Sequence, residues 1–222
     1  MGVAVLTIMA SACGVPGASP FARRSTSATT APNGSVRTTR LRACRTTAAS
    51  VSGPTPLSAS DPIEVATSNA LAPLPVPGLA DRTVVNTVVL ADPEAYLNDA
   101  VIPDPQARLA VMQRDGFRGG VEVDYRSGSD KYGVFVLRFG SPDAALDYTH
   151  AHLADVCTLT QAMGRLPGLA GVSYLRDDNL AKAVFVAGDT EFSLDICTCV
   201  EASHRVVLAA NWAVAIARQL AT

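Results

Sequence analysis

The feature that most constrains the fold is a pattern of strand, turn, strand and helix that occurs twice in the C-terminal half of the chain. In its first occurrence, two runs rich in valine and aromatic residues, 120–126 and 132–139, are separated by Ser127-Gly128-Ser129-Asp130. Glycine, serine and aspartate favour turns for backbone reasons, so these runs are expected to form a hairpin. The following segment, 142–157, is amphipathic at helical spacing and predicts a helix that packs on a sheet.

The second occurrence begins about fifty residues later. Gly171-Val172 repeats Gly120-Val121 after 51 residues, and Val184-Phe185-Val186 repeats Val134-Phe135-Val136 after 50. This unit adds a further strand over 191–200 before a helix over 205–220, which is too short and interrupted to span a membrane. The two units predict an α+β fold, a mostly antiparallel sheet with packed helices in two hairpin-plus-helix units.

Two further elements are predicted ahead of these units. The β-branched run 84–90 is typical of a strand. Residues 103–115 indicate a short helix, with Asp104 as its N-cap and Gly116 suited to the left-handed position after its end.

The charge of the chain divides it into a tail and a body. Residues 1–60 carry six arginines and no aspartate, glutamate or lysine, whereas residues 61–222 carry 12 basic against 20 acidic side chains, a net charge of −8. Residues 14–75 are rich in serine, threonine, proline and arginine without sustained periodicity, which predicts a disordered linker. The single α+β domain is therefore expected over 76–222. The arginines are not interleaved with aromatic residues, so nucleic-acid binding is not expected.

The first 13 residues resemble an export signal. An apolar run over 3–9 leads to Ala10-Ser11-Ala12, which has the small-residue form of a cleavage site, and Cys13 follows at the position where a bacterial lipobox cysteine is acylated. No basic residue precedes the run, and Ala10 stands where a lipobox usually has leucine. A start codon assigned too far downstream would explain the missing basic residues. We expect export, lipidation of Cys13, and anchoring on the outer face of the cytoplasmic membrane.

The remaining cysteines predict a disulfide. Cys157 ends the first predicted helix, and Cys197 and Cys199 lie two apart on one face of a strand. In an oxidising compartment a bridge from Cys157 to one of that pair is expected. A zinc or redox site built from the same three thiols is the alternative.

The sequence holds few residues that indicate a reaction. His150 and His152 lie about 200° apart on a helix, so they are not expected to bind one metal ion, and no metal or cofactor is predicted. No catalytic motif is recognised. Arg118, Tyr125 and Arg126 are the best polar candidates for contacting a ligand, because they lie near a strand edge.

The layout of the chain resembles the small exported lipoproteins of actinobacterial cell envelopes. The resemblance rests on Cys13, the Ser/Thr/Pro linker, the Gly116-Phe117-x-x-Gly120 segment, and an α+β body with late cysteines. It implies a location and an anchor more than a reaction.

Three hypotheses for function follow. The first is a non-catalytic envelope lipoprotein whose domain binds a protein partner or an apolar or envelope ligand. The second is an envelope enzyme with a site of dispersed residues such as His150, Asp155 and Arg126. The third is a cytosolic globular protein with a mis-assigned start, which free thiols at Cys157, Cys197 and Cys199 would support.

Overall fold

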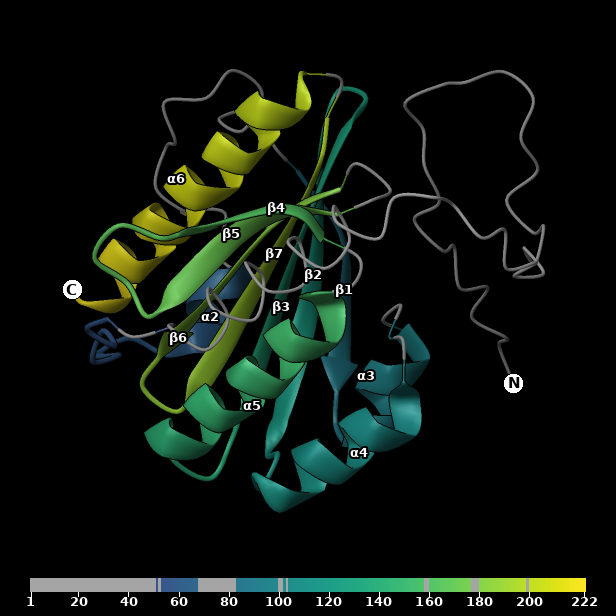
Figure 1. The fold of residues 1–222 in the computed structure, drawn as a ribbon, viewed down its shortest axis with the longest axis vertical. Helices are drawn as coiled ribbons and strands as arrows, with labels where there is room; N and C mark the ends of the chain where they lie inside the picture. The colour runs from purple at the N-terminus through teal and green to yellow at the C-terminus, as the bar shows by residue number, and fades with distance from the viewer. Residues whose placement is uncertain are drawn as a thin grey trace, which may run out of the picture.

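The fold is a seven-stranded antiparallel sheet with helices on both faces, seen in a computed structural model (Figure 1). The structure describes residues 51, 53–67, 83–99, 102, 104–157, 160–176, 180–198 and 200–222. The antiparallel sheet and its packed helices confirm the predicted α+β class.

The strands follow the spatial order β1-β2-β3-β7-β6-β5-β4, so β7, the last in sequence, lies at the centre. β1 and β4 form the two edges. The bounds are β1 Thr83–Leu90, β2 Gly119–Ser127, β3 Asp130–Arg138, β4 Thr160–Arg165, β5 Gly171–Arg176, β6 Ala181–Ala187 and β7 Thr190–Cys197.

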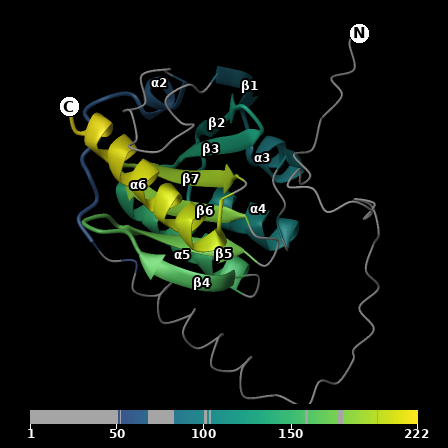
Figure 2. The same cartoon turned by 90° about the horizontal axis from the view of Figure 1, so that it is seen from above.

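The helices cover the two faces unequally. On one face α6 (Ala202–Leu220) packs on β5, β6 and β7, and the short α2 (Pro62–Thr67) packs on β2 and β3. On the opposite face α5 (Pro142–Val156) packs on β6 and β7, α4 (Pro105–Arg114) packs on α5, and α3 (Pro93–Asp99) contacts β1. Figure 2 shows β1 at one border of the sheet, away from α6.

The main core lies between the sheet and α6. Trp212 of α6 is fully buried and meets Tyr125 of β2 and Tyr132 of β3 edge-on, with ring centroids 6.0 Å apart in both pairs. Phe185 and Phe192 stack beside them at 4.9 Å. Aromatic burial of this kind dominates the energetics of a core.

Both predicted hairpin-plus-helix units are present, but their helices lie on opposite faces. The repeated glycines have one physical reason in both units: a Cβ on Gly120 would collide with the carbonyl oxygen of Val136, and one on Gly171 with that of Val184. The helix predicted over 103–115 is α4, and Asp104 caps it by accepting a hydrogen bond from the Ala107 amide at 3.0 Å.

A strap formed by Val51 and residues 53–67 passes from one face of the sheet to the other. Val51 is buried in a cluster with Leu153 and Val156 of α5. The strap then bonds to the Gly188 amide through the Pro56 carbonyl, and ends in α2, where the Ala66 carbonyl accepts a hydrogen bond from the Tyr125 hydroxyl. These residues fall within the range 14–75, for which a disordered linker is predicted from the sequence. They extend the packed domain toward the N-terminus.

Candidate functional site

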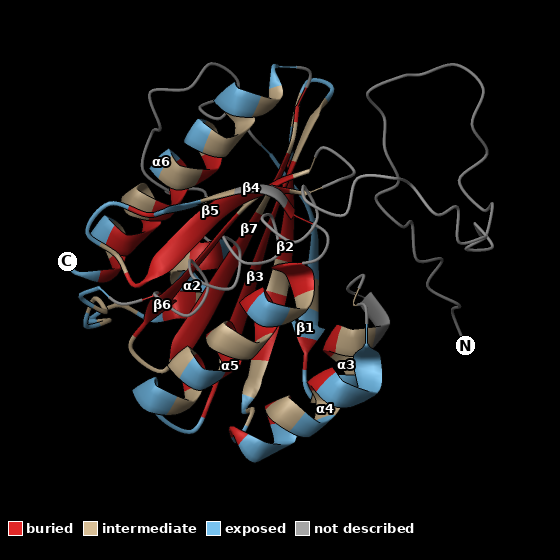
Figure 3. Ribbon diagram, in the orientation of Figure 1, coloured by how far each residue is buried: buried red, intermediate tan, exposed pale blue. Residues whose placement is uncertain are grey.

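The central strand β7 carries a polar stripe on the face that α5 covers. Its residues alternate: Phe192, Leu194 and Ile196 enter the core beneath α6, and Glu191, Ser193, Asp195 and Cys197 lie on the other face. A central strand covered on both sides is expected to be apolar on both, so buried polar residues there are informative. Glu191 is 0% exposed (Figure 3, where β7 is red).

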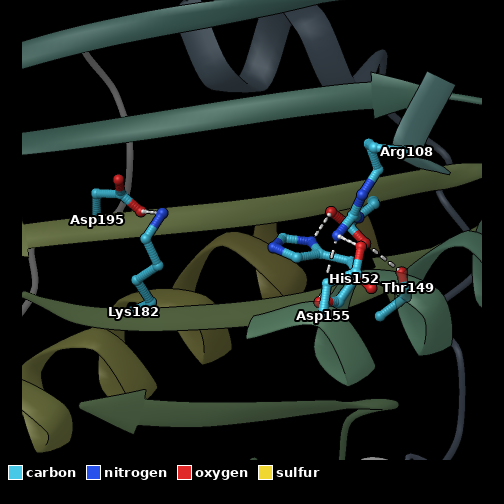
Figure 4. A network of polar contacts seen from close by, with 7 residues as sticks. Arg108, Thr149, His152, Asp155, Lys182 and Asp195 are labelled. Atoms are coloured by element: carbon cyan, nitrogen blue, oxygen red, sulfur yellow. Dashed lines mark hydrogen bonds and ion pairs between the residues drawn. The ribbon is translucent and has the colours of Figure 1, made fainter. Parts of the chain in front are cut away.

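Two side chains of α5, which Figure 4 labels as His152 and Thr149, bond to the carboxylate of Glu191. His152 Nδ1 lies 2.9 Å from Glu191 Oε1, and the Thr149 hydroxyl donates to Oε2 at 2.5 Å. A carboxylate only accepts, so the imidazole donates its Nδ1–H. These two residues lie one turn apart on α5, and together they fix the helix to the centre of the sheet.

Burial lowers the pKa of His152, although the charge of Glu191 and the hydrogen bond to it oppose the shift. At neutral pH the imidazole is therefore uncharged. The Glu191 carboxylate accepts hydrogen bonds from two donors, His152 and Thr149. Buried and bonded in this way, the pair stabilises the contact between α5 and β7.

Arg108 of α4 is buried beside this pair and is 1% exposed. Its Nη2 lies 2.8 Å from Oδ2 of Asp155 and donates to the carbonyl of His152 at 3.4 Å. The guanidinium carbon lies 5.1 Å from the centre of the Tyr148 ring, within the range of a cation–π interaction. The Nε and Nη1 groups make no hydrogen bond within the described part of the chain. Arg108 therefore connects α4 to α5 with part of its donor capacity unused.

A second polar pair lies farther along the stripe. Lys182 of β6 and Asp195 of β7 are directly opposite in the register, and Nζ lies 2.6 Å from Oδ1 (Figure 4). Tyr174 of β5 faces Lys182 in turn. Burial raises the pKa of Tyr174 well above its usual range, and the charge of Asp195 adds to the shift, so the phenol stays neutral.

The three predicted ligand-contacting residues do not gather. Tyr125 is fully buried against Trp212 in the core. Arg126 is exposed on the opposite face, near the end of β2, and Arg118 precedes the start of that strand and donates to the Gly140 carbonyl at 3.2 Å. The two arginines are eight positions apart along extended chain, which separates them by about 26 Å.

The three residues of the dispersed-site hypothesis, His150, Asp155 and Arg126, each contact a different part of the fold. His150 Nε2 lies 3.4 Å from the Val51 carbonyl, and Asp155 pairs with Arg108, whereas Arg126 lies on the β2–β3 hairpin. Within the described ranges, no group of three histidine, cysteine or acidic residues is placed to hold a metal ion. His150 and His152 have separate partners, as their spacing on a helix requires.

The described cysteines differ in state. Cys197 is a free thiol, and Cys157 is disulfide-bonded. Cys197 is therefore not its partner, and Cys199 lies outside the described residues, as do Cys13 and the other residues up to 50. The predicted bridge between Cys157 and Cys199 therefore stays a prediction.

Sequence reasoning missed the His152–Glu191 pair. The available signal was the alternation Thr-Glu-Phe-Ser-Leu-Asp-Ile-Cys over 190–197, which places an acid, a hydroxyl, an acid and a thiol on one face of a strand.

A comparison with known protein families, with curated proteins and with solved structures finds no match. No helix among the residues that the structure places is long and apolar enough to cross a membrane.

Proposed function

We propose that the chain is an exported, lipid-anchored, non-catalytic binding domain that takes up an extended segment of a protein by adding a strand to β1. The observation that carries the proposal is the state of this edge strand. Seven of its eight residues are exposed or half-buried, with Val89 74% and Val85 50% exposed. Figure 3 shows β1 largely in pale blue beside the red central strands.

An edge strand presents a row of unpaired backbone N–H and C=O groups, and native proteins usually protect it with charge, proline or a cover. β1 has the sequence Thr-Val-Val-Asn-Thr-Val-Val-Leu, with neither a charged residue nor a proline. Within the described ranges it pairs only with β2. Backbone pairing supplies affinity in strand addition, and exposed valines supply apolar contact.

The contacts of the buried polar stripe support a structural role for it. Glu191 already accepts from His152 and Thr149, and Arg108 already pairs with Asp155. A histidine acting as a general base needs a substrate proton within hydrogen-bond reach. Here the imidazole is buried between α5 and β7 with its Nδ1–H bonded internally.

One observation favours the enzyme hypothesis as a second candidate: a histidine and a carboxylate lie within hydrogen-bond distance. That pairing recurs in general base catalysis. A reaction at this pair would require α4 to move away from α5, since Arg108 lies beside His152.

Site-specific photo-crosslinking in the producing cell tests the binding proposal. A photoreactive residue at position 89 is expected to give a discrete protein adduct. The matched control is position 207, an equally apolar valine that is 54% exposed on α6, far from β1. An adduct of equal yield from both positions, or none from position 89, would overturn the proposal.

The anchor is tested separately by mass spectrometry of the chain purified from its own membrane fraction. A diacylglyceryl-modified N-terminus at Cys13 is expected. An intact N-terminus at Met1 in the soluble fraction contradicts export and favours the cytosolic hypothesis.

A further inference from the structure

We infer that the strand added to β1 is the β1 of a second copy of this chain, so that two copies form a two-fold dimer with one sheet continuous across both. The inference rests on the proposed function, because it names the partner for the same edge. It follows from the charge, the register and the surroundings of β1.

The charge of β1 suits self-pairing. Two-fold antiparallel pairing places a strand against its own sequence, so every charged residue risks meeting a like charge. Thr83–Leu90 contains no charged residue. On the neighbouring strand β2 the acids are Glu122, which is paired with Val88, and Asp124, which is paired with Asn86. Acids on the two β2 strands would be about 14 Å apart, three strand spacings, which exceeds the screening length of about 8 Å at physiological ionic strength.

The pattern of exposed residues indicates the register. With Thr87 on the two-fold axis, Asn86 lies opposite Val88 of the second copy and Val85 lies opposite its Val89. This register pairs the two most exposed valines of the strand, and Thr87 meets Thr87, a favourable cross-strand pair. The irregularity in the β1–β2 ladder lies between Val84 and Asn86, so the pairs formed by Asn86, Thr87 and Val88 fall in the regular part of the strand.

Among the described residues, the helices of the α6 face leave the edge of β1 open. On the α6 face, α6 reaches β5, β6 and β7, and α2 reaches β2 and β3, while neither makes an extensive contact with β1. Val84, Thr87 and Val89 face this side, because they pair with Tyr125, Val123 and Val121. Figure 2 shows α6 displaced toward the other half of the sheet. A second copy related by a two-fold axis through Thr87 extends the same face.

Sedimentation of the purified full chain tests the dimer. The wild-type chain is expected to show a concentration-dependent dimer. Val89→Lys should raise the dissociation constant by about 100-fold or more, because it opposes a lysine to an apolar side chain at two symmetric positions. Val207→Lys, at a valine on α6 that is 54% exposed, should leave the dimer unchanged. Equal thermal melts for the two variants show that both fold.

The register is tested by oxidative crosslinking. A symmetric disulfide forms only where a residue meets its own copy, so Thr87→Cys is expected to crosslink and Val88→Cys is not. Peptide mapping separates this product from one formed by the native thiol of Cys197. Crosslinking through Val88→Cys alone would overturn the register.

The outcomes separate the two proposals. A wild-type chain that stays monomeric at all concentrations overturns the dimer. If position 89 then still gives a photo-adduct with a different protein in the cell, strand addition stands with another partner. If position 89 gives neither a dimer nor a specific adduct, both proposals fall.

Discussion

His152 on α5 and Glu191 on β7 lie 2.9 Å apart, Nδ1 to Oε1, at the centre of a sheet whose other face is apolar. They are 39 residues apart in sequence, and the pair joins α5 to β7, the last strand of the sheet in chain order. The relationship has direct consequences for stability, which can be measured.

The stability of the domain should fall as the pH drops below about 6.5. An unfolded imidazole titrates near ~6.5, whereas burial lowers the pKa of His152 in the fold. The unfolded chain therefore binds more protons in this window, and the free energy of unfolding decreases with decreasing pH. Urea unfolding between pH 7.5 and 5.5 measures the slope. His152→Gln should flatten it, and His204→Gln, at an exposed position of α6, should not.

Removing the carboxylate of Glu191 should be strongly destabilising. Glu191→Ala leaves a buried imidazole and a buried hydroxyl without their acceptor, at a cost of about 3 kcal/mol. Thr149→Val removes one donor and should cost about 1 kcal/mol. Chemical denaturation of both variants at pH 7.5 gives the comparison, and equal losses would contradict the assigned contacts.

Arg108 should be replaceable by an apolar side chain of similar length. Arg108→Met removes a buried charge, two of whose donor groups make no hydrogen bond to a described residue, and Asp155 can then be solvated because its side chain is 35% exposed. The change should cost less than about 1 kcal/mol, whereas Arg108→Ala, which leaves a cavity beside Tyr148, should cost about 3 kcal/mol. If both variants lose the same stability in urea unfolding, the ion pair outweighs the packing.

The repeated glycines should be intolerant of a methyl group. In Gly171→Ala the new Cβ meets the Val184 carbonyl oxygen, Phe185 Cβ at 2.7 Å and Leu166 Cδ1 at 2.9 Å. A loss of about 3 kcal/mol is expected from this overpacking. Gly164→Ala on β4 is the control, because nothing lies within 4 Å of its Cβ position. Gly164→Ala should raise the free energy of unfolding by up to about 1 kcal/mol, because alanine restricts the conformations of the unfolded chain. Thermal unfolding of the two variants distinguishes them.

Alkylation of the native chain should label Cys197 and leave Cys157 unlabelled. Cys197 is a partly exposed free thiol, whereas Cys157 is buried and disulfide-bonded. Iodoacetamide followed by peptide mass spectrometry measures this, before and after reduction in denaturant. Labelling of Cys157 in the unreduced chain would contradict the bridge.

The sequence predicted the hairpin elements well because their signals are local. β2, β3 and α5 lie within a residue or two of the predicted ranges, since valine-rich runs, a Gly-Ser turn and a helical apolar arc each act over a few residues. β4 was missed: Thr-Gln-Ala-Met-Gly-Arg has little β-branched character, and it is a strand through pairing with β5. The sequence also does not predict the short α2 and α3. They have little helical periodicity and are held by packing on neighbouring elements.

The candidate site lay beyond local signals. The face on which a helix packs depends on the handedness and length of connections, so the repeat did not reveal that α5 and α6 cover opposite faces. Glu191 was predicted as part of a strand and His152 as part of a helix, but their contact depends on the placing of β7 beside β3, with 190–197 reaching back to the centre. Tyr125 is a predicted ligand residue because it lies near a strand edge, but its ring packs against Trp212 of α6 in the core.

The strap determines how a pull on the N-terminus would act on the fold. Tension applied ahead of Val51 first loads the cluster of Val51 with α5 and β5, and next the hydrogen bonds that join the strap to Gly188 and Leu220. The pull would break these contacts one after another, starting from Val51. β1 follows α2 in the sequence, so it would be loaded only after them. The edge strand is thereby mechanically shielded, and a domain held under tension by its tail would keep β1 intact until the strap had come away.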